Sequence, residues 1–568
     1  MEIESIHLKG FRNFNDSFIN FNKSTLIIGS NDVGKSNMLH ALRILLDKSL
    51  SDADIEPSEL DFHIGKQDIA AQAEIIITFK DIKEDAVLSI LKGHVSDDGK
   101  TILKYIADRS NLSYKLLIGY SPDEMQEIGS RFYLKYINLK YIQSQRDLEG
   151  FIRKEKKQLL RIAQQLLTDE DAQADELLLS AISSDLSQLN EKISQLKYVN
   201  SATNGVNHEL SKLAHHYSDY EVKLDTGAIE VNDFIDKLKL GAATNGSNVM
   251  LGGDGRNNQI LLALWKAKSM IEQDTAHEVI FYVIEEPEAH LHPHQQRKLA
   301  TYLIKELPGQ ILLSSHSPQI AVNFSPESII RLYSKNGATI AASNGCSKCI
   351  SDSWEDMNYR MSVLPAEVFF SSGVFLVEGP SEILFYNELA QALNIDLDFE
   401  NISILSVDGI SFRVYIGILN ALNIPWVMRT DNDVSKVPNI TPDCWQYAGI
   451  NRCLKIAGKR IIPHSPREIT TQDTHPQLWN HTSTQINEKG IYLSKIDLES
   501  DLVEELSEHI LRVLRKRSNN AAISYLQQKK AIRMRALLSQ IKLELRSLEH
   551  GELAKPLHHL ISMRSASL

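Results

Sequence analysis

The segment STLIIGSNDVGKSNMLHALRILL, at residues 24–46, constrains the fold more than any other part of this 568-residue chain. A short apolar run leads into the pattern Gly-x4-Gly-Lys-Ser, and apolar residues at helical spacing follow it. Glycines before a helix allow backbone N–H groups to face a polyphosphate, while the lysine reaches the β- and γ-phosphates and the serine hydroxyl binds Mg²⁺. The segment therefore predicts a strand, a nucleotide-binding loop and a helix. The residues predicted to bind ATP and its Mg²⁺ here are Gly29, Asn31, Gly34, Lys35, Ser36 and Asn37.

Two later apolar runs end in the polar residues that an ATP-hydrolysing site requires. The run at residues 279–284 is followed by Glu285, predicted to hold Mg²⁺ through water, and by Glu286, predicted to orient or deprotonate the attacking water. The stretch ILLSSHSPQI then places His316 where an imidazole would sense the γ-phosphate. Together with the loop, these runs predict a P-loop ATPase.

The glycine-rich stretch LGGDGRNNQILLAL lies between the loop and the acidic run. In ATPases of the ABC class, such a helix start caps the ATP bound by the opposite protomer through its backbone N–H groups. The residues predicted to do so are Gly253, Asp254 and Gly255. A signature that acts on the partner's nucleotide implies at least a homodimer. The glutamine loop of this class has two candidates, Gln72 and Gln143.

The stretch FLVEGPSEILF, at residues 375–385, opens a second pattern of strands and helices. Glu378 ends its apolar run, and Glu382 lies four residues later. A later apolar run, IPWVMRT, leads into Asp431 and Asp433. Strands that alternate with helices predict a parallel sheet, whose carboxyl edge gathers residues from separate strands. Because crowded carboxylates repel one another unless cations bind them, these residues predict a Mg²⁺ or Mn²⁺ site.

The order of these patterns predicts an α/β protein: an ABC-type P-loop ATPase domain with an inserted helical dimerisation arm, followed by an α/β domain with a parallel sheet. Leucine and isoleucine recur every three or four residues from Leu179 to Leu196, as expected for packed helices. The predicted divisions are 1–150 for the N-terminal part of the ATPase domain, 151–235 for the arm, 236–345 for the C-terminal part of the ATPase domain, 346–366 for a linker and 367–568 for the second domain with its C-terminal helices.

The composition of the chain indicates in which compartment the protein lies and how it can bind nucleic acid. A net charge of −12 argues against coating nucleic acid by bulk electrostatics, but it allows local basic surfaces such as the clusters between residues 452 and 535. No apolar run approaches the roughly 20 residues that span a bilayer. Four cysteines are few for this length and suit a reducing compartment. We therefore expect a cytoplasmic protein without a membrane partner.

Glu at one strand end with Asp-x-Asp at a later one is the pattern of the Toprim domain, a module for metal-dependent phosphodiester chemistry. An ABC-type ATPase followed by Toprim resembles the OLD family of nucleases. The stretches LKGFRNF, GSNDVGKSN, GDGR, IEEPE, LVEGPSE, TDND, GINRCL, IYLSKIDLESDL and YLQQKK are similar to its Gabija antiphage defence branch. This resemblance implies a nucleotide-regulated endonuclease that nicks or cleaves double-stranded DNA.

The resemblance also implies roles for individual residues. Those that look like metal ligands or catalytic groups are Glu378, Glu382, Asp431, Asp433, Asp497 and Lys530, together with Glu286 at the ATP site. Lys530 resembles the basic residue that stabilises the pentavalent phosphate, although Lys529 could take its place, and Asp501 could take that of Asp497. The implied cofactors are Mg²⁺ or Mn²⁺ at the Toprim site and ATP with Mg²⁺ at the loop. The implied partners are double-stranded DNA, a UvrD-like helicase (GajB) and further copies of this chain in a homodimer or homotetramer.

One alternative retains ATP binding but has no cleavage chemistry. A non-cleaving ATP switch or DNA clamp for repair, related to SMC and RecF proteins, would use its second domain for binding alone. A topoisomerase is disfavoured because no tyrosine lies in a recognisable strand-passage domain. DNA nicking in the presence of Mg²⁺ or Mn²⁺ separates the nuclease from the clamp.

Overall fold

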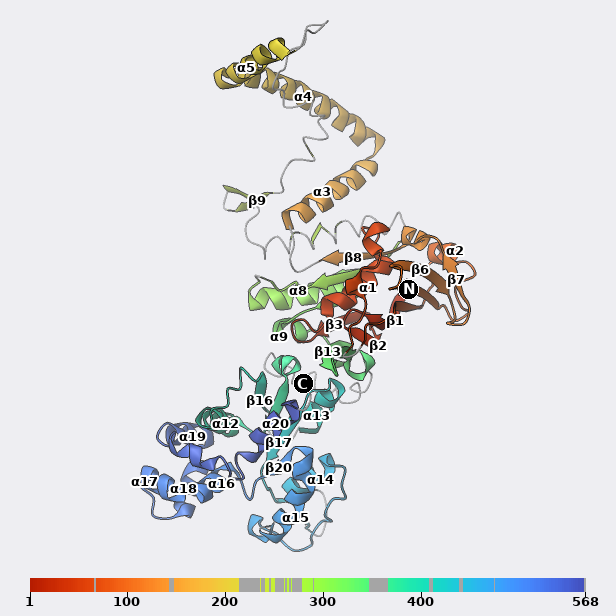
Figure 1. Ribbon diagram of the computed structural model, residues 1–568. Helices are drawn as coiled ribbons and strands as arrows, with labels where there is room; N and C mark the ends of the chain where they lie inside the picture. The colour runs from red at the N-terminus through yellow and green to blue at the C-terminus, as the bar shows by residue number, and fades with distance from the viewer. Residues whose placement is uncertain are drawn as a thin grey trace. The chain divides into compact units, whose positions relative to one another are not determined.

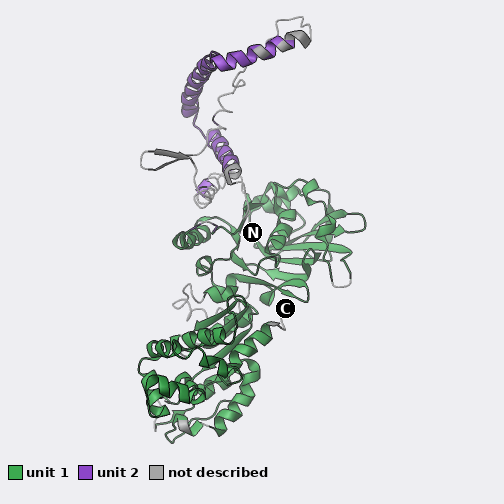
Figure 2. Ribbon diagram, turned by 60° about the vertical axis from the view of Figure 1, so that its left-hand side comes forward, with its two compact units in different colours: residues 1–143, 278–288, 292–568 green, residues 144–277, 289–291 purple. Residues whose placement is uncertain are grey.

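The computed structural model describes residues 1–65, 68–142, 148–213, 278–289, 291–346, 366–407, 412–438, 443–474 and 476–565, with short pieces between 235 and 267. The chain divides into two compact units (Figure 2). The smaller unit comprises residues 144–277 and 289–291, and the larger unit comprises the rest. No helix in the described ranges is long and apolar enough to cross a membrane.

The larger unit begins with an antiparallel sheet of six strands in the order β2-β1-β4-β5-β6-β7 (Figure 1). Its strands are β1 (Glu2–Phe11), β2 (Phe14–Asn20), β4 (Gln72–Lys80), β5 (Thr101–Asp108), β6 (Ser113–Gly119) and β7 (Met125–Ile128). Buried and partly exposed positions alternate along β4, so one face of this sheet points to the core.

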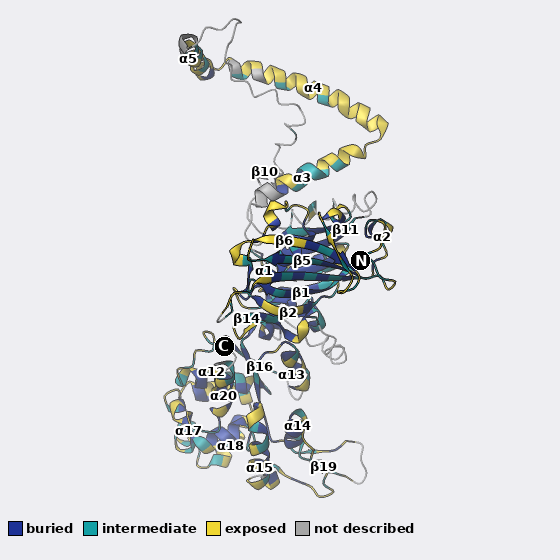
Figure 3. Ribbon diagram, turned by 45° about the vertical axis from the view of Figure 1, so that its right-hand side comes forward, coloured by how far each residue is buried: buried dark blue, intermediate teal, exposed yellow. Residues whose placement is uncertain are grey.

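A second sheet of six strands carries the ATP-binding segments in the order β14-β13-β3-β12-β11-β8, and all its pairs are parallel except that of β13 with β14. Its strands are β3 (Ser24–Ile28), β8 (Ile137–Ile142), β11 (Val279–Glu285), β12 (Gln310–Ser314), β13 (Ile329–Lys335) and β14 (Ala338–Ala341). The predicted strands around 24–28, 279–284 and 310–314 are therefore present. Their almost continuous burial (Figure 3) is typical of parallel strands covered on both faces.

Helix α1 (Lys35–Leu46) follows β3 and joins the two sheets. Its buried Met38, Leu39 and Leu42 belong to one hydrophobic cluster with Ile75 of β4 and Val283 of β11. Helices α8 (Pro293–Glu306) and α9 (Pro318–Ala321) follow β11 and β12. The first turn of α1 is thus held against a packed core.

The last part of the larger unit is built on four parallel strands in the order β16-β15-β17-β20. These are β15 (Gly373–Val377), β16 (Ile402–Ser406), β17 (Trp426–Thr430) and β20 (Ile491–Leu493). The helices are α12 (Pro380–Ala392), α13 (Phe412–Ala421), α14 (Ala448–Ile456), α15 (Gln477–Ile486), α16 (Leu498–Glu505), α17 (Ser507–Leu514), α18 (Asn519–Gln527), α19 (Lys530–Leu538) and α20 (Lys555–Ser565). Apolar residues of α12 and of α16 to α20 form one core with β15 and β17. The predicted parallel sheet with C-terminal helices is confirmed.

The smaller unit contains α3 (Leu148–Gln165), α4 (Asp169–Ser194), α5 (Lys197–Leu213) and a hairpin of β9 (Gly241–Thr244) and β10 (Ser247–Met250). The Thr168 side chain caps α4 by accepting from the N–H of Asp171, and the first turn is acidic, as a helix N-terminus favours. The helix predicted from Leu179 is present, but its apolar side chains, Leu189 among them, are largely exposed (Figure 3). That exposure suits the predicted dimerisation arm. The predicted domain boundaries stay predictions, and most of the linker, residues 347–365, lies outside the described residues.

Candidate functional site

The nucleotide-binding loop connects the end of β3 to the start of α1, as predicted. Gly34 has φ 102°, and a Cβ there would overlap the side chain of Asn13, so only glycine fits. Lys35 is buried, and its Nζ donates to the carbonyl oxygens of Gly29 (2.9 Å) and Ser30 (2.8 Å). The loop therefore folds around its own lysine.

The charge on Lys35 is held in a desolvated place. Burial lowers the pKa of Lys35, while Glu286, Asp32 and Glu285 oppose that shift. Glu285 ends β11 and is also buried, and its Oε1 receives no hydrogen bond among the described residues. A buried carboxylate oxygen without a donor, beside a loop that can cradle phosphate, is the donor chemistry that suits Mg²⁺·ATP.

Glu286 and His316 face each other across the ends of neighbouring strands β11 and β12. The Nε2 of His316 lies 3.4 Å from Oε1 of Glu286. Burial and the charge of Lys35 lower the pKa of His316, whereas Glu286 raises it. The structure thus brings the predicted base and the predicted γ-phosphate sensor together.

A third acidic residue of IEEPE, Glu288, fixes the loop that carries His316. Its Oε1 accepts from the Ser315 hydroxyl (2.6 Å) and from the backbone N–H of His316 (2.8 Å). Sequence reasoning missed this residue, although its place two residues after Glu286 was a usable signal.

Other predicted ATP-site residues are placed differently or fall outside the described ranges. The side chain of Asn37 donates to Asn13 and accepts from Arg12, so it is bonded to residues that precede the loop in the chain. Ser36 and Asn31 are exposed at the loop surface. The signature residues Gly253, Asp254 and Gly255 and the candidate Gln143 lie outside the described residues, and Gln72 lies on β4, where it contacts Asp108.

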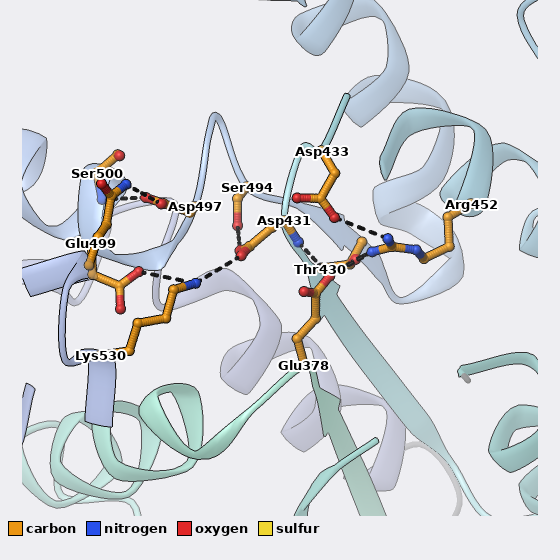
Figure 4. A network of polar contacts seen from close by, with 11 residues as sticks. Glu378, Thr430, Asp431, Asp433, Arg452, Ser494, Asp497, Glu499, Ser500 and Lys530 are labelled. Atoms are coloured by element: carbon orange, nitrogen blue, oxygen red, sulfur yellow. Dashed lines mark hydrogen bonds and ion pairs between the residues drawn. The ribbon is translucent and has the colours of Figure 1, made fainter. Parts of the chain in front are cut away.

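At the second site, Glu378 follows β15 and ties that strand to its neighbour β17 (Figure 4). Its Oε1 accepts from the backbone N–H of Asp431 (3.0 Å) and from the Thr430 hydroxyl. Parallel neighbours end at the same edge, so the predicted ligand Glu378 contacts the backbone of the other predicted ligand, Asp431.

Asp431 and Glu382 are buried beside this contact. Burial raises the pKa of Asp431 well above its usual value, and the charges of Glu378 and Glu382 raise it further. Burial also raises the pKa of Glu382 to about 7, Glu499 adds to this, and Arg429 and Lys530 oppose it. Desolvated carboxylates that raise one another's pKa are the electrostatic signature of a site that takes cations.

Lys530, the first residue of α19, lies between two carboxylates. Its Nζ is 3.7 Å from Asp431 Oδ2 and 3.8 Å from Glu499 Oε2. Glu499 is only 1% exposed, and neither of its carboxylate oxygens accepts a hydrogen bond from the described residues. Sequence reasoning missed Glu499, which lies two residues after Asp497 in the same IDLESDL stretch.

Asp497 and its alternative Asp501 have other partners. Asp497 caps α16 by accepting from the N–H of Ser500 (2.8 Å), and it accepts from Gln527 (2.7 Å). Asp501 forms a buried ion pair with Arg429 of β17, at 2.5 Å. The ligand role of Asp497 stays a prediction, and the pairing of Asp501 is structural.

Asp433 is joined to Glu378 by a basic side chain. Arg452 of α14 donates from Nη1 to Glu378 Oε1 (2.6 Å) and from Nη2 to Asp433 Oδ2 (3.1 Å), as Figure 4 shows. Sequence reasoning counted Arg452 only among the basic clusters between residues 452 and 535 and did not assign it these partners.

We refer to Glu378, Glu382, Asp431, Asp433 and Glu499 as the carboxylate cluster. Among the residues that the structure describes, no three acidic, histidine or cysteine side chains converge on one point as metal ligands. Instead, Arg452 bridges one pair of the cluster and Lys530 bridges another. The donors are oxygen alone, and those of Glu499 are buried and accept no hydrogen bond from the described residues, which suits Mg²⁺ or Mn²⁺.

Fold and sites together define an ATPase domain followed by a Toprim domain. The family described as "AAA ATPase domain" matches residues 1–321, and "Overcoming lysogenization defect protein-like, TOPRIM domain" matches residues 369–433. The chain therefore belongs to the AAA ATPase domain family and carries an OLD-like Toprim domain.

Individual relatives refine this assignment. The chain is 27% identical to the endonuclease GajA of Bacillus cereus (strain VD045) over 578 residues, covering 95% of this chain and 96% of GajA. It is 30% identical to the OLD nuclease of Thermus scotoductus over 161 residues, covering 27% of this chain and 30% of that protein. A solved SMC head bound to the C-terminal winged-helix domain of ScpA aligns with 60% of this chain and 97% of its own, at 19% identity and a TM-score of 0.39. The resemblance to the OLD family is confirmed.

Proposed function

We propose that this chain is a nucleotide-regulated, divalent-metal-dependent DNA endonuclease of bacterial antiphage defence that acts in the cytoplasm. One observation carries the proposal: Glu378 and Asp431 meet at the carboxyl edge of neighbouring parallel strands, beside a buried carboxylate, Glu499, whose oxygens receive no hydrogen bond from the described residues. The names of the relatives, endonuclease GajA and OLD nuclease, support it.

Phosphodiester hydrolysis assigns a task to each part of the Toprim site. A divalent cation, when bound, supplies Lewis acidity that activates the attacking water and steadies the leaving oxygen. The carboxylate cluster, with Asp497 as a further candidate, would hold such ions. Water forms the new bond to phosphorus and loses a proton, while the bond to the 3′ oxygen breaks and that oxygen takes up a proton. Lys530, which is half exposed, would face the phosphate and offset the charge that develops on it.

Basic side chains near Lys530 would hold the DNA backbone. Lys516 and Arg533 lie over the Tyr525 ring, at 4.8 and 3.9 Å from its centroid. Arg533 lies on α19, about one turn after Lys530, and cations held in this way suit contacts to phosphates, which fix position without reading sequence. Double-stranded DNA is the proposed substrate, and a UvrD-like helicase is the proposed partner.

The ATP site would act as a sensor. Lys35 and the loop would bind the phosphates, Glu285 and Ser36 would hold Mg²⁺, and Glu286 would orient water beside His316. A second protomer would complete the site through its Gly253–Gly255 signature, in a dimer or tetramer. Because ATP would bind one arrangement of the dimer better than another, its occupancy would permit or block DNA cleavage.

Plasmid nicking tests this function. Supercoiled plasmid is incubated with Mg²⁺ or Mn²⁺, with and without ATP, and the nicked and linear products are quantified. The wild type should cleave, and Glu378→Ala should lose about 10³-fold or more in rate because a metal ligand is gone. The control Glu388→Ala, on the helix α12 that follows Glu378 but paired with Lys542, should cleave like the wild type.

The nucleotide arm of the same assay uses Lys35→Ala. Its cleavage rate should no longer change when ATP is added, because the phosphate contacts are lost. A wild type that never nicks DNA with either metal would make the chain a non-cleaving clamp. A wild type that nicks at the same rate with and without ATP would leave a nuclease and remove the sensor.

A further inference from the structure

The N-terminus of α14 is attached directly to the loop that holds Asp431 and Asp433. The backbone N–H of Gly449 donates to the carbonyl oxygen of Asp433 (3.0 Å). A Cβ at Gly449 would overlap the carbonyl oxygen of Asp431, so the contact requires glycine. Arg452 lies three residues further along α14, about one helical turn, so that contact places it beside the carboxylate cluster.

The guanidinium of Arg452 is one of three groups that donate to a single oxygen of Glu378. Glu378 Oε1 accepts from the backbone N–H of Asp431, from the hydroxyl of Thr430 at the end of β17, and in addition from Arg452, which also donates to that hydroxyl. Asp433, the other acidic partner of Arg452, is 50% exposed, whereas Arg452 itself is 12% exposed. The arginine therefore sits where the cluster opens to solvent.

A second arginine in the same domain shows what a purely structural pair looks like. Arg429 and Asp501 are both about 5% exposed, and Asp501 also accepts from the backbone N–H groups of Lys495 and Ile496. That pair is closed off from solvent, and Asp501 was predicted only as an alternative to Asp497. Arg452 bridges two predicted metal ligands at an open edge, and this difference points to a role in the reaction.

We propose that Arg452 is a catalytic residue that exchanges Glu378 and Asp433 for the non-bridging oxygens of the scissile phosphate. The inference rests on the proposed nuclease function and deepens it. Glu378 and Asp433 are candidate metal ligands, and a divalent cation bound to them would repel a guanidinium on the same oxygens. The phosphodiester offers two anionic oxygens that match the two N–H groups of the guanidinium fork.

The exchange has one effect before the substrate binds and another during cleavage. Before substrate arrives, Arg452 offsets the repulsion between Glu378 and Asp433, as Lys530 does between Asp431 and Glu499. During cleavage, as water adds to phosphorus and the 3′ oxygen departs with the bonding electrons and gains a proton, Arg452 donates to the oxygens where charge grows. A metal-binding measurement reports the effect before the substrate binds, and a cleavage rate reports the effect during cleavage.

The test compares Arg452→Met and Arg452→Lys with the wild type and with Arg413→Met, a loss of equal charge at an exposed position on α13. Calorimetry with Mn²⁺ alone, without DNA, gives the affinity of the site. Single-turnover plasmid nicking at saturating Mn²⁺ gives the rate. Circular dichroism confirms folding, and Arg452→Lys carries the test if the methionine variant does not fold.

We expect Arg452→Met to bind Mn²⁺ several-fold more tightly and yet to nick about 10²-fold more slowly. Arg452→Lys should bind Mn²⁺ like the wild type and nick about tenfold more slowly, because it retains the charge but not the fork. Arg413→Met should match the wild type in both. Weaker Mn²⁺ binding with an unchanged saturating rate would make Arg452 a support for Glu378 and overturn the proposal. A wild type that nicks nothing would overturn the proposed function itself, and this inference with it.

Discussion

The ATP-binding loop and the Toprim carboxylate cluster neutralise a buried charge in different ways. At the loop, the cation Lys35 is held by the carbonyl oxygens of Gly29 and Ser30, from its own segment. In the cluster, Glu378 and Asp431 are held by side chains and backbone from other segments, including Arg452 and Lys530. The loop is a cationic site suited to an anion, and the cluster is an anionic site suited to cations.

This difference shows how each site depends on the rest of the fold. Backbone dipoles cost no side-chain ordering and do not repel one another, so a few consecutive residues can prepare an anion site. Carboxylates gathered from separate strands and helices do repel one another, so they need opposite charges to be folded in with them. The cluster should therefore respond more strongly than the loop to the loss of a basic partner.

The largest expected effect is on the scaffold of the cluster. Arg429→Met leaves Asp501 buried without its ion pair, so the free energy of unfolding should fall by about 3–5 kcal/mol. Urea unfolding followed by circular dichroism measures it, with the exposed Arg413→Met as control, expected within about 0.5 kcal/mol of the wild type. A loss below about 1 kcal/mol would show that the cluster does not depend on this pair.

A smaller effect separates two acidic residues of IDLESDL. Glu499→Gln removes the carboxylate whose buried oxygens accept no hydrogen bond from the described residues, so Mn²⁺ affinity measured by calorimetry should fall about 10²-fold. Asp497→Ala removes a helix cap, so it should cost about 1 kcal/mol of stability and change Mn²⁺ affinity little. Equal losses of affinity would make Asp497 a ligand as the resemblance implies.

The smallest effect concerns the ATPase side. His40 of α1 faces Arg12, Arg43 and Asp61; burial and then the two arginines lower its pKa to about 4 from an ordinary value of 6.5. The folded state keeps His40 neutral while the unfolded state binds a proton, so stability should fall by about 2 kcal/mol as the pH drops from 6.5 to 4.

His40→Gln tests this pH dependence. Urea unfolding at several pH values between 4 and 7 should show a smaller acid-side loss for this variant than for the wild type. His550→Gln, a change at an exposed histidine, should keep the wild-type slope. Parallel slopes for wild type and His40→Gln would remove His40 as the source of the pH dependence.

Local patterns predicted the elements well because their causes are local. The loop needs residues 29–36 and an adjacent strand and helix, and Glu378 and Asp431 each end an apolar strand, so their meeting followed from parallel pairing. The pairing of Arg452 with Glu378 and Asp433 was not predictable in the same way. It depends on where α14 is attached, and spacing along the chain does not encode that contact.

The choice between Asp497 and Glu499 had a similar physical limit. Both lie in IDLESDL, and an acidic residue before a helix serves equally well as a cap or as a ligand. Only the structure shows that Asp497 accepts from Ser500 and Gln527 while Glu499 turns into the buried cluster. Likewise, the contacts of Glu288 with Ser315 and His316 follow only from the pairing of β11 with β12.

The hydrogen bond from the N–H of Gly449 to the carbonyl oxygen of Asp433 joins the two ends of the segment 433–449. This segment includes the short antiparallel pair of β18 (Ser435–Lys436) and β19 (Trp445–Gln446). Because the two ends of this segment are held together, insertions within it add only the entropic cost of closing a longer loop, and that cost grows slowly with loop length. Changes in the length or sequence of this segment therefore need not move the acids or the arginine that flank it.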